Sequence, residues 1–538
     1  MRILLRGLLI LLILAAGLWF GARHEAPSKA APAVLAADSS EARGAAAFVG
    51  EDFGGLSMAA LESHALPWKL VTAALVLNEG DAAATSVNDI LARYGFLVDA
   101  QVANLPVGVA DRPNALPLGI THGTISPIAG APVQIANLGC AACHAGVTYD
   151  ARGIPDPKTA WIGMPNTSVN LEAYTLAVFR ALKAQESTPD MLMDQVTALY
   201  PETGWRERQT LRWLVLPLVR DRLNKITEDR PLPFPNGVPG ATNGVAALKY
   251  ALGVPLAGGG PADAGIVSIP DLSYRHWRNG LLVDAAYSVP DLPQQVPTTA
   301  ADDTPTKRAE LAAITTFFTV PTMGVHPDAA PDLLPAAEDI FAFLGDNYAP
   351  QPFPGEVNAA MALEGRAIYE AECSTCHGNY AIEQGTPRLT SFPNWIGEIG
   401  TDPLRAQALS DGLVAAIRTT PFNTRISVNV SDGAYAAPPL GGVWASAPYL
   451  HNGSVPSIWA LLTPEARPKV FELGGHMLDF DRLGIALDGG RYPTTYAPFS
   501  TPALFDTRLP GYSNAGHLFG TQLQDAEKEA LIAFLKQL

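Results

Sequence analysis

Cysteine is scarce in this sequence, which has 4 cysteines among 538 residues. They form two pairs, and each pair is followed directly by a histidine, at residues 140–144 and 373–377. The two motifs use every cysteine, so the sequence excludes a disulfide framework. A zinc site would need further cysteine or histidine at close spacing, and a thioredoxin-like redox pair needs no trailing histidine.

The pattern Cys-x-x-Cys-His is instead the attachment signature of c-type haem. The two thiols bond to the porphyrin vinyl groups, and the histidine gives its imidazole to the iron. The spacing makes one turn of backbone, which puts both sulfurs on one edge of the ring and the histidine beneath it. The sequence therefore predicts two covalently bound haem c groups, with thioether bonds at Cys140, Cys143, Cys373 and Cys376 and iron ligands at His144 and His377.

Charged residues are also few, at 16%, and acidic residues outnumber basic ones by 52 to 36. A protein that binds nucleic acid needs a basic face, so the net charge of −16 excludes that class of partner. An acidic surface suits a basic redox partner protein through electrostatic steering. It is equally the ordinary solubility charge of an exported protein.

The N-terminus has an apolar run at residues 7–22. Arg2 and Arg6 precede the run and Arg23 follows it, which is typical of an export signal. The run is a little short for a membrane span, which takes about 20 residues. No clean Ala-x-Ala cleavage site follows directly, so residues 1–22 are a signal peptide or an uncleaved signal anchor. We expect a periplasmic or otherwise exported protein, with anchoring to the inner membrane by residues 7–22 as the alternative to cleavage.

The composition predicts a mainly α fold with extensive loops, because Gly and Pro number 48 and 46. Residues 23–45 are rich in Ala, Ser and Pro and predict a flexible tether. The Pro-rich stretch at residues 349–354 is the predicted domain boundary. It divides the chain into an N-terminal haem domain, residues 46–350, and a C-terminal cytochrome c domain, residues 351–538.

Apolar periodicity predicts helices in the first half, and Gly and Pro punctuate the rest. The expected helices are residues 58–94 with a break at 78–80, 169–183, 206–226, 309–318 and 336–344. Residues 105–138 predict loops and short strands, so we expect the first motif to be reached without an N-terminal helix. The basic residues of 206–226 are more typical of a solvated face than of a grip on haem carboxylates.

The second half has the pattern of a class I cytochrome c with an enlarged middle. Gly365, Tyr369 and Cys373 recur every four residues on a helix that runs into the motif. Gly365 has no side chain, so another helix can pack closely there. The expected partner is the C-terminal helix, whose apolar stripe is Leu531, Phe534, Leu535 and Leu538.

The second axial ligand of each iron is less clear from the sequence. In a class I cytochrome it lies in the loop before the last helix, and His517 stands there, eight residues before Asp525. The alternatives for the second haem are His451, His476 and Met477. For the first haem no residue stands out among His122, His276, His326, Met164 and Met323, since each has an ordinary structural explanation. Trp277 and Trp444 are candidates for aromatic residues near the first and second haem, although core packing is the commoner role of Trp.

Several stretches resemble the signature of di-haem cytochromes of the rubber-oxygenase-like group, itself related to bacterial di-haem cytochrome c peroxidases. They are residues 440–456, Leu-Gly-Gly-Val-Trp-Ala-Ser-Ala-Pro-Tyr-Leu-His-Asn-Gly-Ser-Val-Pro, together with residues 400–403, 514–517 and 140–146. The resemblance implies an N-terminal haem that is open to oxygen or peroxide and a six-coordinate C-terminal haem that passes electrons. It also points to His517 as the second ligand of the C-terminal haem. The chain is shorter than the rubber oxygenases, and its motif spacing of 233 residues is wider than in the peroxidases.

Two classes of function follow. The first is an oxidoreductase whose N-terminal haem activates oxygen or peroxide. Dioxygenase chemistry on a small apolar substrate is favoured over peroxidase chemistry, and the C-terminal haem transfers electrons. The second is a non-enzymatic electron carrier with two six-coordinate haems. No catalytic residue is identified from the sequence.

Overall fold

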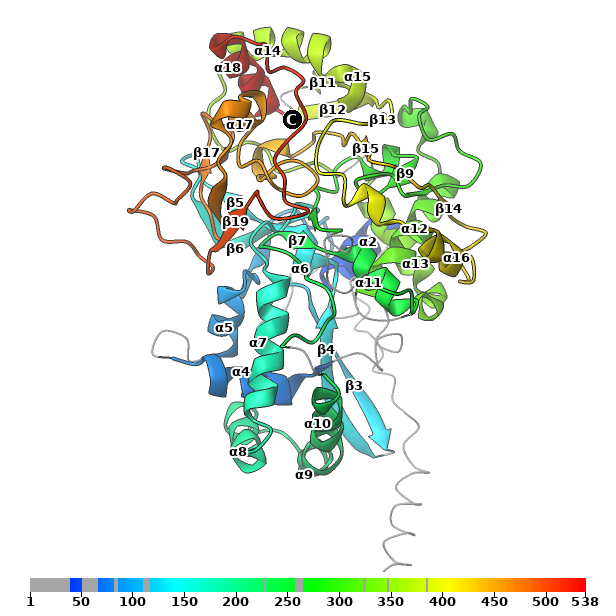
Figure 1. The fold of residues 1–538 in the computed structure, drawn as a ribbon, viewed down its shortest axis with the longest axis vertical. Coiled ribbons are helices and arrows are strands. Elements are labelled where there is room, and N and C mark those ends of the chain that lie inside the picture. Colours follow the sequence, from blue (N-terminus) through cyan, green and yellow to red (C-terminus); the bar gives the residue numbers. More distant parts are fainter. Residues whose placement is uncertain are drawn as a thin grey trace, which may run out of the picture.

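The computed structural model describes residues 39–538 apart from 51–65, 82–85, 110–116, 129, 227–228, 257–264, 323–325, 346–347 and 384–385. An upper body contains the C-terminus and most of the second half, and a lobe extends below it (Figure 1). The apolar run at 7–22 lies outside the described residues. Within the described residues, no helix combines the length and the apolar character that a membrane crossing requires.

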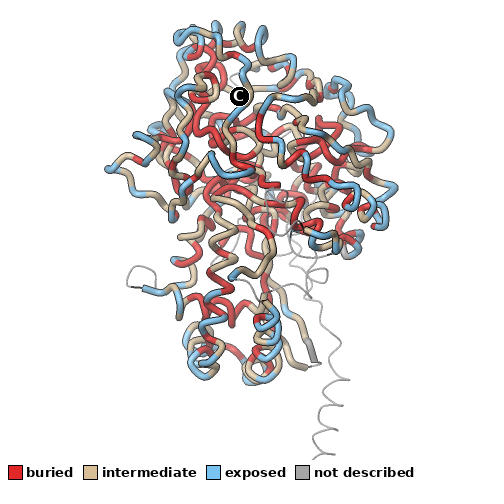
Figure 2. The backbone as a smooth tube through the Cα atoms, viewed as in Figure 1, coloured by how far each residue is buried: buried red, intermediate tan, exposed pale blue. Residues whose placement is uncertain are grey.

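The lower lobe is built mainly from helices and one long hairpin. Its elements are α4 (Trp68–Glu79), α5 (Val87–Arg93), α7 (Leu171–Ala184), α8 (Pro189–Leu199) and the antiparallel strands β3 (Ile120–Ile128) and β4 (Ala131–Leu138), with β1 (Leu66–Pro67) beside β4. Buried residues fill the interior of the lobe as well as that of the upper body (Figure 2). The predicted break at 78–80 is confirmed, because α4 ends at Glu79 with Gly80 as its C-cap.

The predicted basic helix 206–226 is also confirmed and lies at the far end of the lobe (Figure 1). It consists of α9 (Trp205–Thr210), the π-helical turn η2 (Leu211–Val215) and α10 (Leu216–Asn224). Arg212 pairs with Asp190, and Lys225 pairs with Asp221. These contacts fit the solvated face that the sequence favoured.

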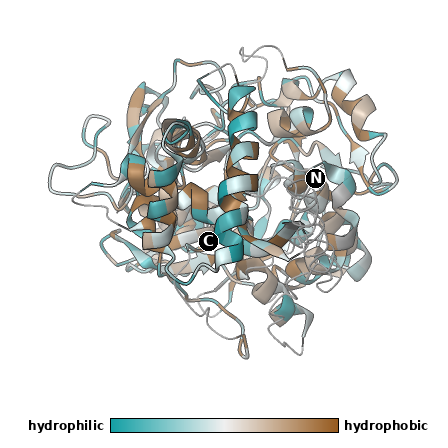
Figure 3. Ribbon diagram, turned by 90° about the horizontal axis from the view of Figure 1, so that it is seen from below, coloured by the Kyte–Doolittle hydropathy of each residue, from teal (hydrophilic) through white to brown (hydrophobic). Residues whose placement is uncertain are grey.

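The upper body contains the remaining helices and many short strands. The helices are α2 (Ser40–Val49), α6 (Cys140–His144), α11 (Gly244–Ala251), α12 (Pro305–Thr322), α13 (Leu334–Phe343), α14 (Ala359–Glu372), α15 (Ser374–His377), α16 (Asp411–Ile417), α17 (Ile458–Leu462) and α18 (Asp525–Leu535), with 3-10 turns η4 (Arg275–Trp277) and η9 (Val443–Ala445). Helices seen from below carry both hydrophilic and hydrophobic residues, as amphipathic helices do (Figure 3).

The strands pair mostly in twos and threes. One three-stranded sheet joins β2 (Gln101–Val102), β6 (Pro155–Ile162) and β5 (Ala145–Tyr149), and another joins β9 (Gly280–Leu281), β10 (Tyr287–Ser288) and β14 (Ser427–Val428). The two-stranded pairs are β7–β8 (Ala241–Thr242, Val267–Ser268), β11–β12 (Asn379–Glu383, Thr386–Ser391), β13–β15 (Ile396–Gly397, Tyr435–Ala436), β16–β19 (Val470–Leu473, Ala503–Asp506) and β17–β18 (Leu478–Asp479, Gly484–Ile485). The prediction of a mainly α fold is therefore confirmed only in part.

Helices α14 and α18 cross where the sequence predicted. A Cβ atom at Gly365 would lie 1.8 Å from the carbonyl oxygen of Ala530, so only glycine permits this approach. One turn further along each helix, the rings of Tyr369 and Phe534 lie 5.1 Å apart between centres.

Helices α2 and α13 repeat the same crossing in the first half. A Cβ atom at Gly44 would lie 1.9 Å from the carbonyl oxygen of Asp339. One turn further along, the rings of Phe48 and Phe343 lie 6.3 Å apart between centres. In all four helices the aromatic residue stands four positions after the residue at the crossing. The first half therefore has an N-terminal helix after all, separated from the motif by inserted structure.

This crossing corrects the predicted tether at residues 23–45. Its last residues, from Ser40 on, belong to α2, and Ser39 caps that helix by accepting a hydrogen bond from the amide of Ala42. The Ala-rich composition suggested a tether because the segment has few large apolar residues. The chain does reach the first motif from a strand, since β4 ends two residues before Cys140, but β3 and β4 are longer than the short strands that were predicted.

The two predicted haem domains share one hydrophobic core. The sheet β9–β10–β14 combines strands of both halves, and Thr298 pairs with Phe392 in an isolated bridge. The indole N–H of Trp444 donates to the carbonyl of Gln351 at 3.0 Å, and its ring packs on Tyr149 of the first half at 6.1 Å. Trp444 is therefore a core residue that joins the halves, the commoner of the two roles considered for it.

Candidate haem sites

The second motif is presented by the end of α14 and by the short helix α15. Asn358 caps α14 by accepting hydrogen bonds from the amides of Ala360 and Met361. The hydroxyl of Tyr369 donates to the carbonyl of Gly378 at 2.8 Å and so ties the helix to the residue after the motif. The motif is therefore placed by a capped helix against which α18 packs.

Cys373, Cys376 and His377 line a large cavity in the upper body. The cavity contains about 1690 Å³ of unfilled space, part of it open to solvent. Much of its wall is apolar, and the lining includes Trp395, Tyr435, Leu450, Ile458, Phe519, Leu531 and Leu535. A wide apolar cavity beside two thiols and a histidine fits a porphyrin, which is flat, apolar and bonded along one edge.

His517 lies across this cavity from His377. The centres of the two imidazole rings are 6.4 Å apart. Two imidazoles bound on opposite sides of one metal ion would have centres roughly 6 Å apart, because each metal–nitrogen bond is about 2 Å and the ring centre lies about 1 Å behind the nitrogen. The separation therefore suits two axial ligands of one iron.

The loop that carries His517 is fixed from two sides. The amide of His517 donates to the carbonyl of Ile399 at 2.7 Å, and a Cβ atom at Gly516 would lie 2.3 Å from the amide nitrogen of Thr401. Arg467 donates to the carbonyls of Asn514 and Gly516 at 2.6 and 2.9 Å. Two of the stretches that carried the family resemblance, residues 400–403 and 514–517, are thus neighbours in the fold.

Hydrogen bonding and burial give His377 the form that binds metal. Its Nδ1 lies 2.8 Å from the carbonyl oxygen of Pro438, and since a carbonyl only accepts, Nδ1 carries the proton. The lone pair is left on Nε2, as in metal-ligating histidines generally. Burial lowers the pKa of His377, and burial lowers the pKa of His517 to about 4, so both imidazoles are neutral at pH 7.

The first motif is held in the same way. His144 Nδ1 lies 3.1 Å from the carbonyl oxygen of Pro270, and burial lowers the pKa of His144 to about 4. Each proline stands four residues before a residue with positive φ, Tyr274 in the first half and Gly442 in the second. A 3-10 turn follows each of these residues, η4 and η9. The local structure that orients the two histidines is therefore repeated.

The four cysteines of the two motifs are partly buried. Burial raises the pKa of Cys140, Cys143 and Cys373 to about 12 and also raises that of Cys376. Each thiol is therefore protonated at pH 7 and acts as an apolar group in this state. That environment suits a thioether, which carries no charge.

Of the remaining candidates for the second haem, His451 and His476 lie in two different places, and Met477 directly follows His476 in the chain. His451 lines the cavity and stacks on Tyr435, with ring centres 4.2 Å apart. That position agrees with a role near the haem edge. His476 lies elsewhere, because its Nε2 is 3.5 Å from the hydroxyl of Thr167, and the amide of the neighbouring Asn166 donates to the carbonyl of Cys143.

The candidates for the first haem are spread over the first half. His122 packs on Trp68 in the lower lobe, with ring centres 4.8 Å apart. His276 is buried 3.8 Å from Asp303, and His326 lies on the surface 3.3 Å from Asp328. Met164 is buried beside Gly146, two residues beyond His144, and Met323 lies outside the described residues.

Sequence reasoning missed three parts of the sites. The first is α2, although Gly44 and Phe48 repeat the spacing of Gly365 and Tyr369. The second is the pair of prolines that orient the histidines. The third is a set of charged residues in the cavity wall. They are Asp271, Arg275 and Arg278, and they lie in the segment that begins after Pro270.

Comparison with known proteins agrees with this geometry. Residues 434–472 match the protein family described as RoxA-like, cytochrome c-like. The matched stretch contains Pro438, which orients His377, and His451, which lines the cavity. The chain therefore contains a cytochrome c-like domain near its C-terminal end, and such a domain implies covalently bound haem c.

Two proteins of Sinorhizobium fredii (strain NBRC 101917 / NGR234) are similar to the chain. The uncharacterized protein y4iJ is 26% identical over an alignment of 528 residues, which covers 84% of this chain and 85% of that protein. The uncharacterized protein y4iM is 30% identical over 201 residues, which cover 32% of this chain and 44% of that protein. The first similarity extends over both halves of the chain.

Proposed function

We propose that the protein is an exported di-haem c-type cytochrome in which the two haems have different roles. The observation that carries the proposal is the pair His377 and His517, which face each other at 6.4 Å across a cavity lined by Cys373 and Cys376. The repeated helix crossing and the repeated bond from histidine to a proline carbonyl support a second haem at Cys140 and Cys143.

The C-terminal haem transfers electrons in this proposal. His377 and His517 would both bind its iron, which would leave no position for a substrate. Much of the cavity wall is apolar, and His451, which also lines the cavity, stacks on Tyr435.

The N-terminal haem is the proposed reaction centre. When bound, a haem iron with one open position activates oxygen or peroxide. His144 would hold the iron from one side, with its ring fixed by Pro270. His122, His276 and His326 contact Trp68, Asp303 and Asp328, and the family resemblance implies a distal side that is open to a small molecule. Dioxygenase chemistry on a small apolar substrate is favoured, and peroxidase chemistry is next.

The cellular part of the proposal rests on the N-terminal sequence. Residues 7–22 act as the export signal or as an anchor in the inner membrane, and the globular part lies outside the cytoplasm. A redox partner protein supplies or accepts the electrons. The acidic net charge of −16 suits a basic partner.

Visible spectroscopy of the exported, purified protein tests the proposal. We expect a mass increase equal to two haems, and a spectrum in which one haem is low-spin while the other shifts on addition of carbon monoxide or imidazole. Two low-spin haems that ignore added ligands would favour the non-enzymatic electron carrier instead. A colourless protein with the mass of the bare polypeptide would refute the proposal altogether.

A further inference from the structure

The wall of the cavity at the second motif contains a group of charged residues, of which Arg278 is buried and Asp271 and Arg275 are half-buried. Among the described residues that line it, the cations are Arg275 and Arg278, and they stand together with Asp271. Arg278 is 2% exposed and donates to the carbonyl of Leu282 at 2.9 Å. Arg275 donates through Nε to the carbonyl of Asp271 at 2.8 Å. Each guanidinium has five N–H donors, so these contacts use a small part of its capacity.

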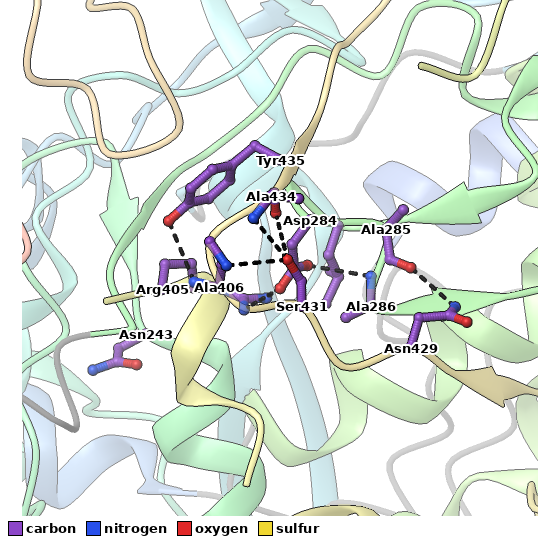
Figure 4. Close-up of polar contacts among 12 residues, drawn as sticks. Asn243, Asp284, Ala285, Ala286, Arg405, Ala406, Asn429, Ser431, Ala434 and Tyr435 are labelled. Carbon is purple, nitrogen blue, oxygen red and sulfur yellow. Dashed lines mark hydrogen bonds and ion pairs between the residues drawn. The ribbon is translucent and has the colours of Figure 1, made fainter. Parts of the chain in front are cut away.

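The carboxylates near Arg275 and Arg278 balance only part of the positive charge of these two residues. The nearby carboxylate of Asp284 is bound to Arg405 at 2.6 Å, in the network drawn in Figure 4. Burial lowers the pKa of Arg275 to about 10 and that of Arg278 to about 9, and the mutual repulsion of the two guanidiniums adds to the effect on Arg278. Burial also raises the pKa of Asp271 to about 6, so this carboxyl is still mostly charged at pH 7 and offsets one of the two guanidiniums. The three side chains together keep a net positive charge, which favours an anion in the cavity.

The porphyrin proposed for this cavity has the matching chemistry. It is bonded to protein along the edge that carries its vinyl groups, and its other edge carries two carboxylates. Guanidinium groups bind carboxylates through paired hydrogen bonds, which gives both charge and geometry. We propose that Arg275 and Arg278 bind the carboxylate groups of the haem attached at Cys373 and Cys376. This inference rests on the proposed function, because it requires a haem at the second motif.

The same chain segment also reaches the first motif. Pro270 lines the cavity of the second motif, and its carbonyl accepts the hydrogen bond from His144. Residues 270–278 therefore connect the carboxylate end of one haem to the axial histidine of the other. A change of charge at Arg278 should act strongly on the second haem and more weakly on the first, which identifies the haem that Arg278 contacts.

The test is a redox titration of the haem-loaded full chain, followed by absorbance. Reduction adds one negative charge to the haem, so a nearby cation favours the reduced form. We expect Arg278→Met to lower the ratio of reduced to oxidised second haem about tenfold at a fixed potential, which is a shift of about 59 mV for one electron. Arg275→Met should act in the same direction. The matched control is Arg388→Met, a surface arginine 61% exposed and 3.8 Å from Glu383, which should leave the potential unchanged.

The variant Arg278→Lys distinguishes an effect of the lost charge from an effect of the substitution on folding. It keeps the positive charge, so its potential should stay closer to that of the wild type than that of Arg278→Met. Loss of the second haem from Arg278→Met with retention in Arg278→Lys and Arg388→Met would also support the inference. A haem-loaded Arg278→Met with the wild-type potential, or an equal shift in Arg388→Met, would overturn it. A wild-type protein without haem at the second motif would instead refute the proposed function.

Discussion

His144 and His377 are distant in the sequence, yet each is bound through Nδ1 to a proline carbonyl, at 3.1 and 2.8 Å. The bond fixes both the tautomer and the ring orientation, so the side chain is ready to bind metal before any metal arrives. At the scale of single residues, the site depends on these hydrogen bonds to the histidines as much as on the histidines themselves.

Replacement of His517 by alanine should convert the second haem to a high-spin form, because the imidazole opposite His377 is removed. Absorbance of the oxidised protein measures the change. His451→Ala is the matched control, since His451 lines the same cavity and stacks on Tyr435. A low-spin spectrum that persists in His517→Ala and disappears in His451→Ala would assign the ligand to His451.

Protonation of His476 should destabilise the folded protein in acid. Burial lowers its pKa from 6.5 to about 4, so between these values the unfolded chain binds a proton that the folded chain does not. The free energy of unfolding is therefore unaffected by His476 above pH 6.5. It falls as the pH drops toward 4, by on the order of 3 kcal/mol in total. Urea unfolding at pH 7.5 and pH 5 measures this loss of stability.

His476→Gln should remove this part of the pH dependence, whereas the surface variant His326→Gln should not. Equal pH dependence in His476→Gln and the wild type would contradict the prediction.

At the scale of elements, two helix crossings of the same form frame the two motifs. In each, a glycine allows contact with the backbone of a second helix, and aromatic rings pack one turn further along. There is no space for a methyl group at such a contact, because the two helix backbones cannot move apart without opening the core between them.

Gly365→Ala and Gly44→Ala should each lower the free energy of unfolding by about 1–3 kcal/mol or more, because the added Cβ atom would lie within 2 Å of a carbonyl oxygen. Thermal unfolding followed by circular dichroism measures the loss. The matched control is Gly204→Ala, where a Cβ atom would meet nothing within 4 Å. Unchanged unfolding temperatures for both crossing variants would show that the helices are not held together as described.

At the scale of the whole molecule, the two halves form one body around a shared core. The largest hydrophobic cluster runs from α2 to the last residue of the chain and includes residues that contact Cys140 and Cys373. A haem bound at either motif would therefore stabilise more than its own half. The lower lobe has a separate core, and Figure 2 shows its buried interior.

Cys373→Ala or Cys376→Ala should prevent stable folding of the last domain, because a haem would supply much of the material that fills a cavity of about 1690 Å³. A melt followed by far-ultraviolet circular dichroism and by haem absorbance measures the effect. Ser374→Ala, between the two thiols, is the control and should stay within about 0.5 kcal/mol of the wild type. A melt of the cysteine variants that matches the wild type would contradict the prediction.

The sequence by itself determined the two attachment motifs, the helices with strong apolar periodicity and the glycine contact between α14 and α18, because each depends on residues close together in the chain. It also singled out His517 from its distance to the last helix, and that assignment stays a prediction. Only the tertiary structure decided that α2 is a packed helix, that His476 lies beside Thr167 rather than in the cavity, and that Arg275 and Arg278 line it. These facts depend on contacts between segments hundreds of residues apart, and no local pattern of side chains encodes which distant backbone will lie against them.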